Sequence, residues 1–202
     1  GYEPGDSLSL IIPFLFRHIN LQPKSRVLDF GCNESSVSIE LASMGHEVVG
    51  VDMNDYPLSH PNFKFVKGDF LKNDFADCSF DAVIAISAVE HCGVPESYGA
   101  EEVPDGDRKI VKEFLRVLKQ GGKLILTVPY GIKGLQTGPL GQRIYDKESL
   151  SSLLRGLKLV DEEYYIGIAR RHWLPCMAKD LAAVDSNRTG FVQGVACIYA
   201  EK

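Results

Sequence analysis

A single glycine lies between two acidic residues in segment 26–52, at a spacing that suits nucleoside recognition. Gly31 follows a short apolar run and allows the tight turn and close backbone approach that a bound ligand needs. Asp52 ends the next apolar run, about twenty residues further on, where nucleotide-binding α/β folds place the acid that binds the ribose hydroxyls. The segment therefore predicts a strand, a turn, a helix and a second strand that together bind a nucleoside.

The charges around the turn indicate which nucleoside is bound. A dinucleotide pyrophosphate requires several glycines, whose backbone N–H groups surround its anionic oxygens. Here Gly31 stands alone, with Asp29 before it and Glu34 after it. Two carboxylates repel a pyrophosphate but suit a ligand that carries an ammonium and a sulfonium group. S-adenosylmethionine is such a ligand, whereas NAD and FAD are not.

Four segments, in order and spacing, resemble the class I S-adenosylmethionine-dependent methyltransferases over roughly residues 8–165. They are the turn RVLDFGCNESS with the distal Asp52, the step Gly68-Asp69-Phe70, the run SFDAVIAISAVEH at 79–91, and the run DRKIVKEFLRVLKQGGKLILTVPYG at 107–131. The resemblance implies an α/β fold with a Rossmann-like doubly wound sheet, strand order 3-2-1-4-5-7-6 and an antiparallel strand 7. Asn33 departs from the family pattern, which has a second glycine there.

The resemblance also assigns residues to the methyl donor. Asp29 either caps the turn or pairs with the ligand ammonium, and Met53 packs on an adenine face, for which a thioether is suited. Asp69 faces the adenine amino group, unless it is only a turn residue. Phe70 donates its backbone N–H to the adenine ring. Ser87 belongs to the loop over the donor methyl group. The predicted cofactor site comprises Asp29, Gly31, Asp52, Met53, Asp69, Phe70 and Ser87.

The nature of the acceptor determines whether a catalytic base is needed. Methyl transfer is an in-line displacement, in which proximity and alignment supply most of the acceleration. An amine or thiolate reacts without a base, whereas an alcohol must lose its proton as the bond forms. His91 ends the loop after the fourth strand, where donor and acceptor should meet, and is the candidate base. The alternative is that His91 only braces the loop; His172 and Tyr130 are reserve candidates.

The acceptor class rests on resemblance alone. The runs at 103–131 and 143–150 resemble methyltransferases of surface-glycan and secondary-metabolite pathways, which implies a small hydroxyl-bearing acceptor such as a saccharide. Two alternatives stay open: methylation of a nitrogen on a small metabolite, peptide or RNA, and a non-catalytic module that binds S-adenosylmethionine. The loop 92–106 and the segment 167–190 are predicted to cover the acceptor site.

The elements that position these residues can be read from periodicity. Helices are expected over 8–19, over 107–119 and from the N-cap Asp146 to Leu154. A further helix should bury Val37, Leu41 and Met44 and end at Gly45. The glycine pair 121–122 should stop the helix over 107–119. Five βα-like units to Val128 precede two closing antiparallel strands at 157–166 and 191–200.

Composition places these elements in one domain spanning 1–202. The chain has 202 residues, 45% hydrophobic and 24% charged, as is ordinary for a globular protein. A net charge of −5, with no basic cluster beyond Arg170-Arg171, disfavours long nucleic acid as a partner. Five scattered cysteines without a C-x-x-C pair predict neither a metal site nor disulfides, and favour a reducing, cytoplasmic location. No apolar run is long enough to cross a membrane, and the oligomeric state is left open.

Overall fold

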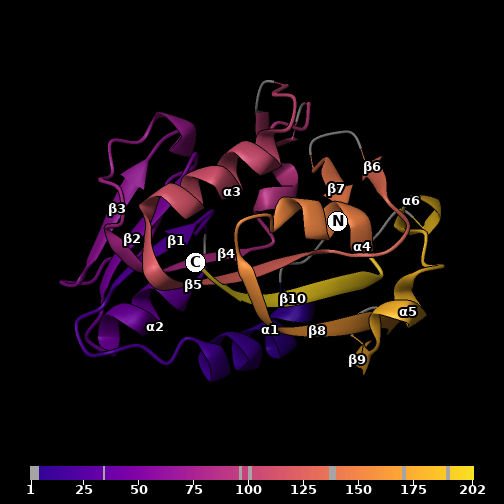
Figure 1. Cartoon of the computed structure of the whole chain (residues 1–202), viewed down its shortest axis with the longest axis horizontal. Helices are drawn as coiled ribbons and strands as arrows, with labels where there is room; N and C mark the ends of the chain where they lie inside the picture. The colour runs from indigo at the N-terminus through magenta and orange to yellow at the C-terminus, as the bar shows by residue number, and fades with distance from the viewer. Residues whose placement is uncertain are drawn as a thin grey trace.

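The computed structural model describes residues 5–33, 35–95, 97–99, 102–136, 140–169, 172–189 and 192–202. Its centre is an eight-stranded sheet of order β3-β2-β1-β4-β5-β10-β8-β9 (Figure 1). The strands are β1 Arg26–Phe30, β2 Glu47–Asp52, β3 Phe63–Lys67, β4 Phe80–Ile86, β5 Leu118–Pro129, β8 Lys158–Ala169, β9 His172–Cys176 and β10 Gly194–Glu201. The first five strands pair in parallel, whereas β10 is antiparallel to both β5 and β8.

The strand order confirms the predicted fold. When β8 is counted as the sixth strand and β10 as the seventh, the order is 3-2-1-4-5-7-6. The strand β9 is an addition at the sheet edge, antiparallel to β8. A separate two-stranded antiparallel sheet, made of β6 Gly134–Gln136 and β7 Gln142–Ile144, was not predicted either.

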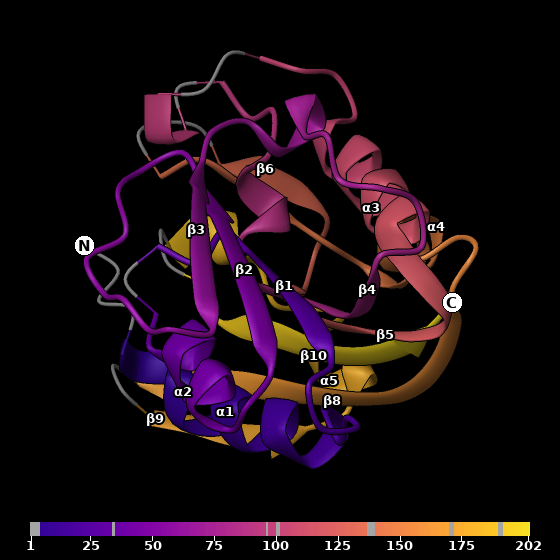
Figure 2. The ribbon, with the colours of Figure 1, turned by 90° about the vertical axis from the view of Figure 1, so that its left-hand side faces the viewer.

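Helices cover both faces of the sheet, as Figures 1 and 2 show. On one face lie α1 Gly5–His18 and α2 Val37–Ser43; on the other lie α3 Gly106–Val117 and α4 Lys147–Leu153. Each face has its own hydrophobic cluster, one built on α1 and α2 and one on α3 and α4. The remaining elements are short: η1 Phe70–Lys72, η2 Val89–His91, η3 Ser97–Gly99, α5 Ala178–Leu181 and α6 Ser186–Thr189. This layering leaves the carboxyl ends of the parallel strands free for a ligand.

One predicted helix boundary is confirmed and another is wrong. Asp146 caps α4 as predicted: its Oδ1 accepts the Ser149 backbone N–H at 2.8 Å, and the Ser149 hydroxyl completes a capping box. The predicted end of α3 at the glycine pair is wrong. The helix stops at Val117, because Leu118 already has an extended backbone and begins β5, which contains both glycines.

Three further expectations differ from the structure. Met44 is 59% exposed, and Ala42 is buried on α2 in its place. The five βα-like units are incomplete, because residues 53–62 between β2 and β3 form no helix. The segment 167–190 is not a continuous loop, since it contains β9, α5 and α6. The basic pair at 170–171 lies outside the described residues.

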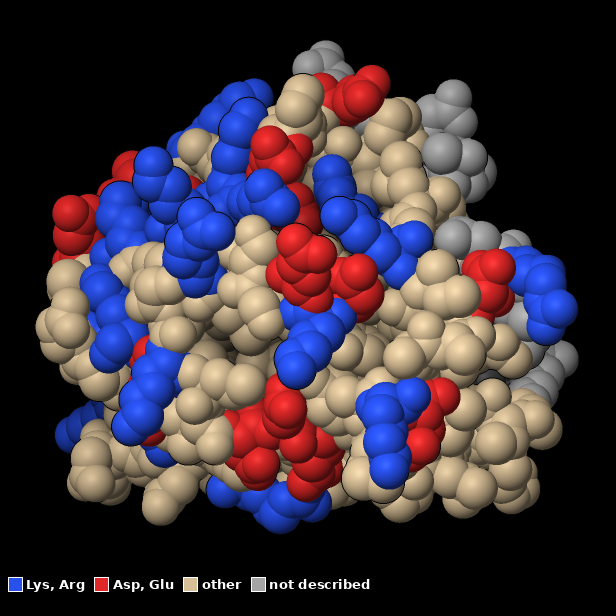
Figure 3. Space-filling model, turned by 45° about the vertical axis from the view of Figure 1, so that its right-hand side comes forward, with Lys and Arg blue, Asp and Glu red and all other residues tan. Residues whose placement is uncertain are grey.

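No helix in the described ranges is long and apolar enough to cross a membrane. On the face drawn in Figure 3, basic and acidic side chains are interspersed.

Candidate active site

The turn after β1 brings the backbone against the loop that follows β4. Gly31 has a φ of +68°, in the left-handed region that residues with side chains rarely adopt. A Cβ at this position would lie 2.5 Å from the Cβ of Ala88, so the turn requires glycine for a second reason. Asn33 also has a positive φ of +38°, which asparagine tolerates better than most residues. The departure from the family glycine is therefore compatible with the turn; Glu34 lies outside the described residues.

Asp52 lies at the end of β2, and its carboxylate contacts the turn. Oδ2 accepts the Asn33 backbone N–H at 2.9 Å, and Oδ1 accepts the Asn54 backbone N–H at 2.8 Å. A carboxylate oxygen has room for a second hydrogen bond. Asp52 is also partly exposed, so it can order the turn and accept from two ribose hydroxyls at once.

Asp29 lies inside the protein, below the turn. It is 3% exposed, and its Oδ2 accepts a hydrogen bond of 2.7 Å from the Ser38 hydroxyl of α2. Burial raises the pKa of Asp29 to about 7, the Ser38 bond opposes that rise, and the nearby Asp52 charge adds to it. A cationic ligand group beside Asp29 would favour the ionised carboxylate. The pairing of Asp29 with the donor ammonium fits this environment and stays a prediction.

The predicted adenine-binding residues lie near the ends of β2 and β3. Met53 is 58% exposed, so it is not core filler and its thioether is free to pack against a ring. Asp69 caps η1 through a 2.9 Å bond from the Leu71 N–H to Oδ1, and Oδ2 lies 3.6 Å from the Lys72 ammonium. Phe70 is 2% exposed among core aromatic rings, so its backbone N–H is the group it can offer to a ligand. The adenine contacts stay predictions.

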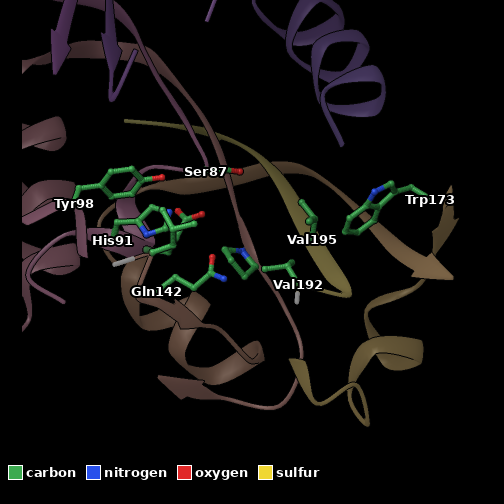
Figure 4. A pocket seen from close by; sticks show the side chains of 10 residues that line it. Ser87, His91, Tyr98, Gln142, Trp173, Val192 and Val195 are labelled. Carbon is green, nitrogen blue, oxygen red and sulfur yellow. The ribbon is translucent and has the colours of Figure 1, made fainter. Parts of the chain in front are cut away.

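A cavity lies at the carboxyl end of β4, beside the predicted donor site (Figure 4). Its volume is about 520 Å³, including the part open to solvent. Its polar lining consists of Ser87, Glu90, His91 and Gln142, and its apolar and aromatic lining consists of Tyr98, Pro129, Leu140, Trp173, Val192 and Val195. Of the predicted cofactor residues, Ser87 is the one in this lining. The cavity is therefore placed to receive a methyl acceptor.

The two predicted cover segments each contribute one residue to the cavity. Tyr98 comes from the loop 92–106, and Trp173 comes from the segment 167–190. In Figure 4, Tyr98 lies beside His91, and Trp173 lies at the other end, beyond Val195. Closure of these segments over a ligand stays a prediction.

His91 is held in one orientation by a backbone carbonyl. Its Nδ1 lies 2.7 Å from the Gly141 oxygen, which can only accept, so the proton is on Nδ1 and Nε2 carries the lone pair. The Ser97 hydroxyl donates to the same oxygen at 2.6 Å, and the Tyr98 ring meets the imidazole edge-on at 5.0 Å. Burial lowers the pKa of His91, which the Gly141 bond partly offsets. The imidazole is therefore neutral near pH 7, as a general base must be.

Glu90 precedes His91 and lines the same cavity. It is 1% exposed, and burial raises the pKa of its carboxyl group to about 8. The backbone around it is fixed by Arg143 of β7, which donates to the Cys92 carbonyl at 2.5 Å and lies 3.7 Å from the Asp107 carboxylate. The loop after β4 is thus anchored to the small hairpin sheet.

Several site residues were missed from the sequence. Gly141 and Gln142 belong to the β6–β7 region and contribute a carbonyl and a cavity-lining amide. Tyr56 was also missed; its hydroxyl donates to the Ser35 carbonyl at 2.5 Å and fastens the loop after β2 to the turn. The role of a backbone carbonyl cannot be predicted from the type of residue that carries it. Tyr56 could have been predicted, because it is an aromatic residue in a polar loop close to Asp52.

Comparisons with known proteins identify a methyltransferase domain in the chain. Residues 28–126 match the family model of a methyltransferase domain. A sterol 24-C-methyltransferase of Yarrowia lipolytica is 35% identical over 121 residues, which cover 54% of this chain and 29% of that protein. The chain spans about a third of the length of the curated relatives that it matches.

Solved structures share the fold at low sequence identity. The 1,6-didemethyltoxoflavin-N1-methyltransferase of Burkholderia thailandensis, bound to S-adenosylhomocysteine, has a TM-score of 0.70 at 16% identity, over 98% of this chain and 80% of that one. The cyclase SpnF has a TM-score of 0.66 at 20% identity, over 96% of this chain and 80% of that one. The matched domain begins within β1 and ends within β5, and so includes the glycine turn, Asp52 and His91. Residues 28–126 therefore form a methyltransferase domain of the class I S-adenosylmethionine-dependent type, whose methyl donor is S-adenosylmethionine.

Proposed function

We propose that the protein transfers a methyl group from S-adenosylmethionine to a hydroxyl group of a small molecule bound in the cavity. The observation that carries the proposal is the Nδ1 bond of His91 to the Gly141 carbonyl, at 2.7 Å. It leaves the basic lone pair on Nε2, and His91 lines a cavity beside the predicted donor site. An alcohol needs such a base, whereas an amine does not.

The proposed role of each residue follows from its place in the site. S-adenosylmethionine supplies an electrophilic methyl group on a sulfonium. Asp52, Met53 and the turn at Gly31 bind and orient its nucleoside, and Asp29 balances its ammonium charge. His91 accepts the hydroxyl proton at Nε2 as the acceptor oxygen is methylated. The apolar and aromatic lining excludes water from the reacting groups.

The residue types that line the cavity also indicate the class of acceptor. Six of the ten lining residues are apolar or aromatic, which favours an acceptor with an apolar body over a bare saccharide. The relative from Yarrowia lipolytica is named as a sterol 24-C-methyltransferase, so methylation of carbon on an apolar acceptor is the second candidate. In that case His91 would remove a proton from carbon. Nitrogen methylation, the third candidate, would leave His91 dispensable.

Labelled product identifies the acceptor atom directly. The protein is incubated with ¹³C-methyl S-adenosylmethionine and a cell extract, and the products are detected by mass spectrometry and NMR. The chemical shift of the new methyl group distinguishes attachment to oxygen, carbon or nitrogen. A methyl group on nitrogen would contradict the proposal, and the absence of any labelled product would favour a non-catalytic binding module.

Substitution of the base provides the second test. His91→Ala should lower turnover by about a hundredfold to ten-thousandfold, with S-adenosylhomocysteine affinity unchanged. His60→Ala is the matched control, because His60 precedes the amino end of β3, away from the cavity, and should turn over at the wild-type rate. Wild-type turnover in His91→Ala would show that His91 only braces the loop.

A further inference from the structure

The Glu90 carboxyl group has one oxygen without a partner. Oε2 is buried and makes no hydrogen bond to any residue that the structure describes. The residue is 1% exposed, yet it lines the cavity. A buried polar atom without a partner is costly, so such atoms are rare and usually have a functional reason. The side chain borders space that a ligand can occupy, which points to a ligand as the missing partner.

The polar groups packed around Glu90 make their hydrogen bonds to groups other than its Oε2. Arg143 donates to the Cys92 carbonyl and lies against Asp107. The Tyr145 hydroxyl donates to the same Asp107 carboxylate at 2.8 Å. His91 uses its Nδ1 on the Gly141 carbonyl. These groups anchor the loop without the Glu90 side chain, so a purely structural role does not account for a carboxyl group at this position.

We propose that Glu90 binds a second polar group of the acceptor, adjacent to the hydroxyl group that His91 deprotonates. This rests on the proposed function, because it takes His91 as the base. Glu90 and His91 are consecutive and line one cavity whose remaining lining is mostly apolar. The acceptor class is therefore an apolar body that carries a hydroxyl next to a second hydroxyl or a carbonyl.

The protonation state of Glu90 agrees with this role. Burial raises its pKa to about 8, so the group is mostly a neutral acid near pH 7. A neutral carboxyl group can both donate and accept. It can therefore pair with a hydroxyl or a carbonyl, and it adds no charge to an apolar cavity. Glu90 is a positioning residue, which orients the acceptor so that the reacting hydroxyl faces Nε2 of His91.

Two probes of matched size test the proposal: cyclohexanol and trans-cyclohexane-1,2-diol. Their affinities are measured by ligand-observed NMR, on the protein saturated with S-adenosylhomocysteine. Wild type should bind the diol about 3- to 10-fold more tightly than cyclohexanol, which corresponds to the net free energy of one hydrogen bond. Glu90→Leu should bind both probes within about twofold of one another, and Glu90→Gln should retain part of the preference. His91→Ala should retain at least part of the preference, since the Glu90 contact is intact.

Stability separates this role from a structural one. The ligand-free Glu90→Leu variant should be at least as stable to heat at pH 7 as wild type, with S-adenosylhomocysteine affinity unchanged, because an unpartnered carboxyl group has been removed. The proposal is wrong if wild type does not prefer the diol, if Glu90→Leu keeps the preference, or if that variant is less stable than wild type. A diol preference that depends on Glu90, in a protein whose labelled product carries the methyl on nitrogen, would overturn the proposed base instead.

Discussion

Replacement of Asp52 by alanine tests the assignment of the donor site. The carboxylate accepts two backbone N–H groups, at 2.9 and 2.8 Å, and is predicted to accept two ribose hydroxyls as well. A hydrogen bond to a charged group contributes about 1.5 to 3 kcal/mol, and the partial exposure of Asp52 argues for the low end. At the low end, two lost ribose bonds therefore amount to about 3 kcal/mol, a rise in the dissociation constant of about 150-fold.

Titration calorimetry with S-adenosylhomocysteine measures this change. Asp52→Asn keeps one acceptor oxygen and should bind with intermediate affinity. Asp55→Ala is the matched control, because its side chain is 86% exposed and pairs on the surface with Lys67. It should bind as wild type does, since exposed ion pairs contribute little. The reasoning is refuted if Asp52→Ala binds within twofold of wild type.

Two further predictions concern stability. Gly31→Ala and Gly45→Ala both place a side chain at positive φ, which costs about 1 to 2 kcal/mol, but the added Cβ clashes with Ala88 at position 31 and meets nothing within 4 Å at position 45. Thermal unfolding should therefore show the larger loss for Gly31→Ala, and equal losses would show that the turn relaxes. The raised pKa of Glu90, about 8 against 4.5, means that the folded state keeps a proton that the unfolded chain has lost, so Glu90 lowers stability as pH rises from about 4.5 to about 8. Relative to wild type, Glu90→Gln should gain stability across that window, by at most about 5 kcal/mol at 1.36 kcal/mol per pKa unit. The raised pKa of Asp29 is present in both proteins, so its effect on stability cancels in the comparison. The assignment would be contradicted if the difference in unfolding free energy between the two proteins were the same at pH 5 and at pH 8.

The donor half of the fold could be predicted from the sequence because its determinants are local. The glycine at position 31 is required by its own φ, and Asp52 lies at the strand end where the spacing places it. The sheet order, which needs long-range information, came from the family resemblance. Asp146 was predictable for the same local reason, since a capping box involves residues three apart.

The acceptor half was harder to predict because its contacts are distant or lack a side chain. His91 is oriented by the carbonyl of Gly141, fifty residues later in the chain. The strand β9 forms by pairing with β8, and its sequence, HWLPC, does not alternate apolar with polar residues. Met44 shows the limit of helical periodicity: the spacing is correct, but α2 ends at Ser43, and the side chain that follows is mostly exposed.

The anchoring of His91 by the β6–β7 region divides the protein into two parts that can change separately. The family match ends at residue 126, and six cavity-lining residues lie beyond it: Pro129, Leu140, Gln142, Trp173, Val192 and Val195. Insertions or substitutions in residues 130–195 can therefore reshape the acceptor cavity and re-aim the imidazole, while the turn at Gly31 and the carboxylate of Asp52 stay as they are. A chimaera that exchanges this segment between two such domains should inherit its choice of acceptor from the segment and its affinity for the methyl donor from the remainder.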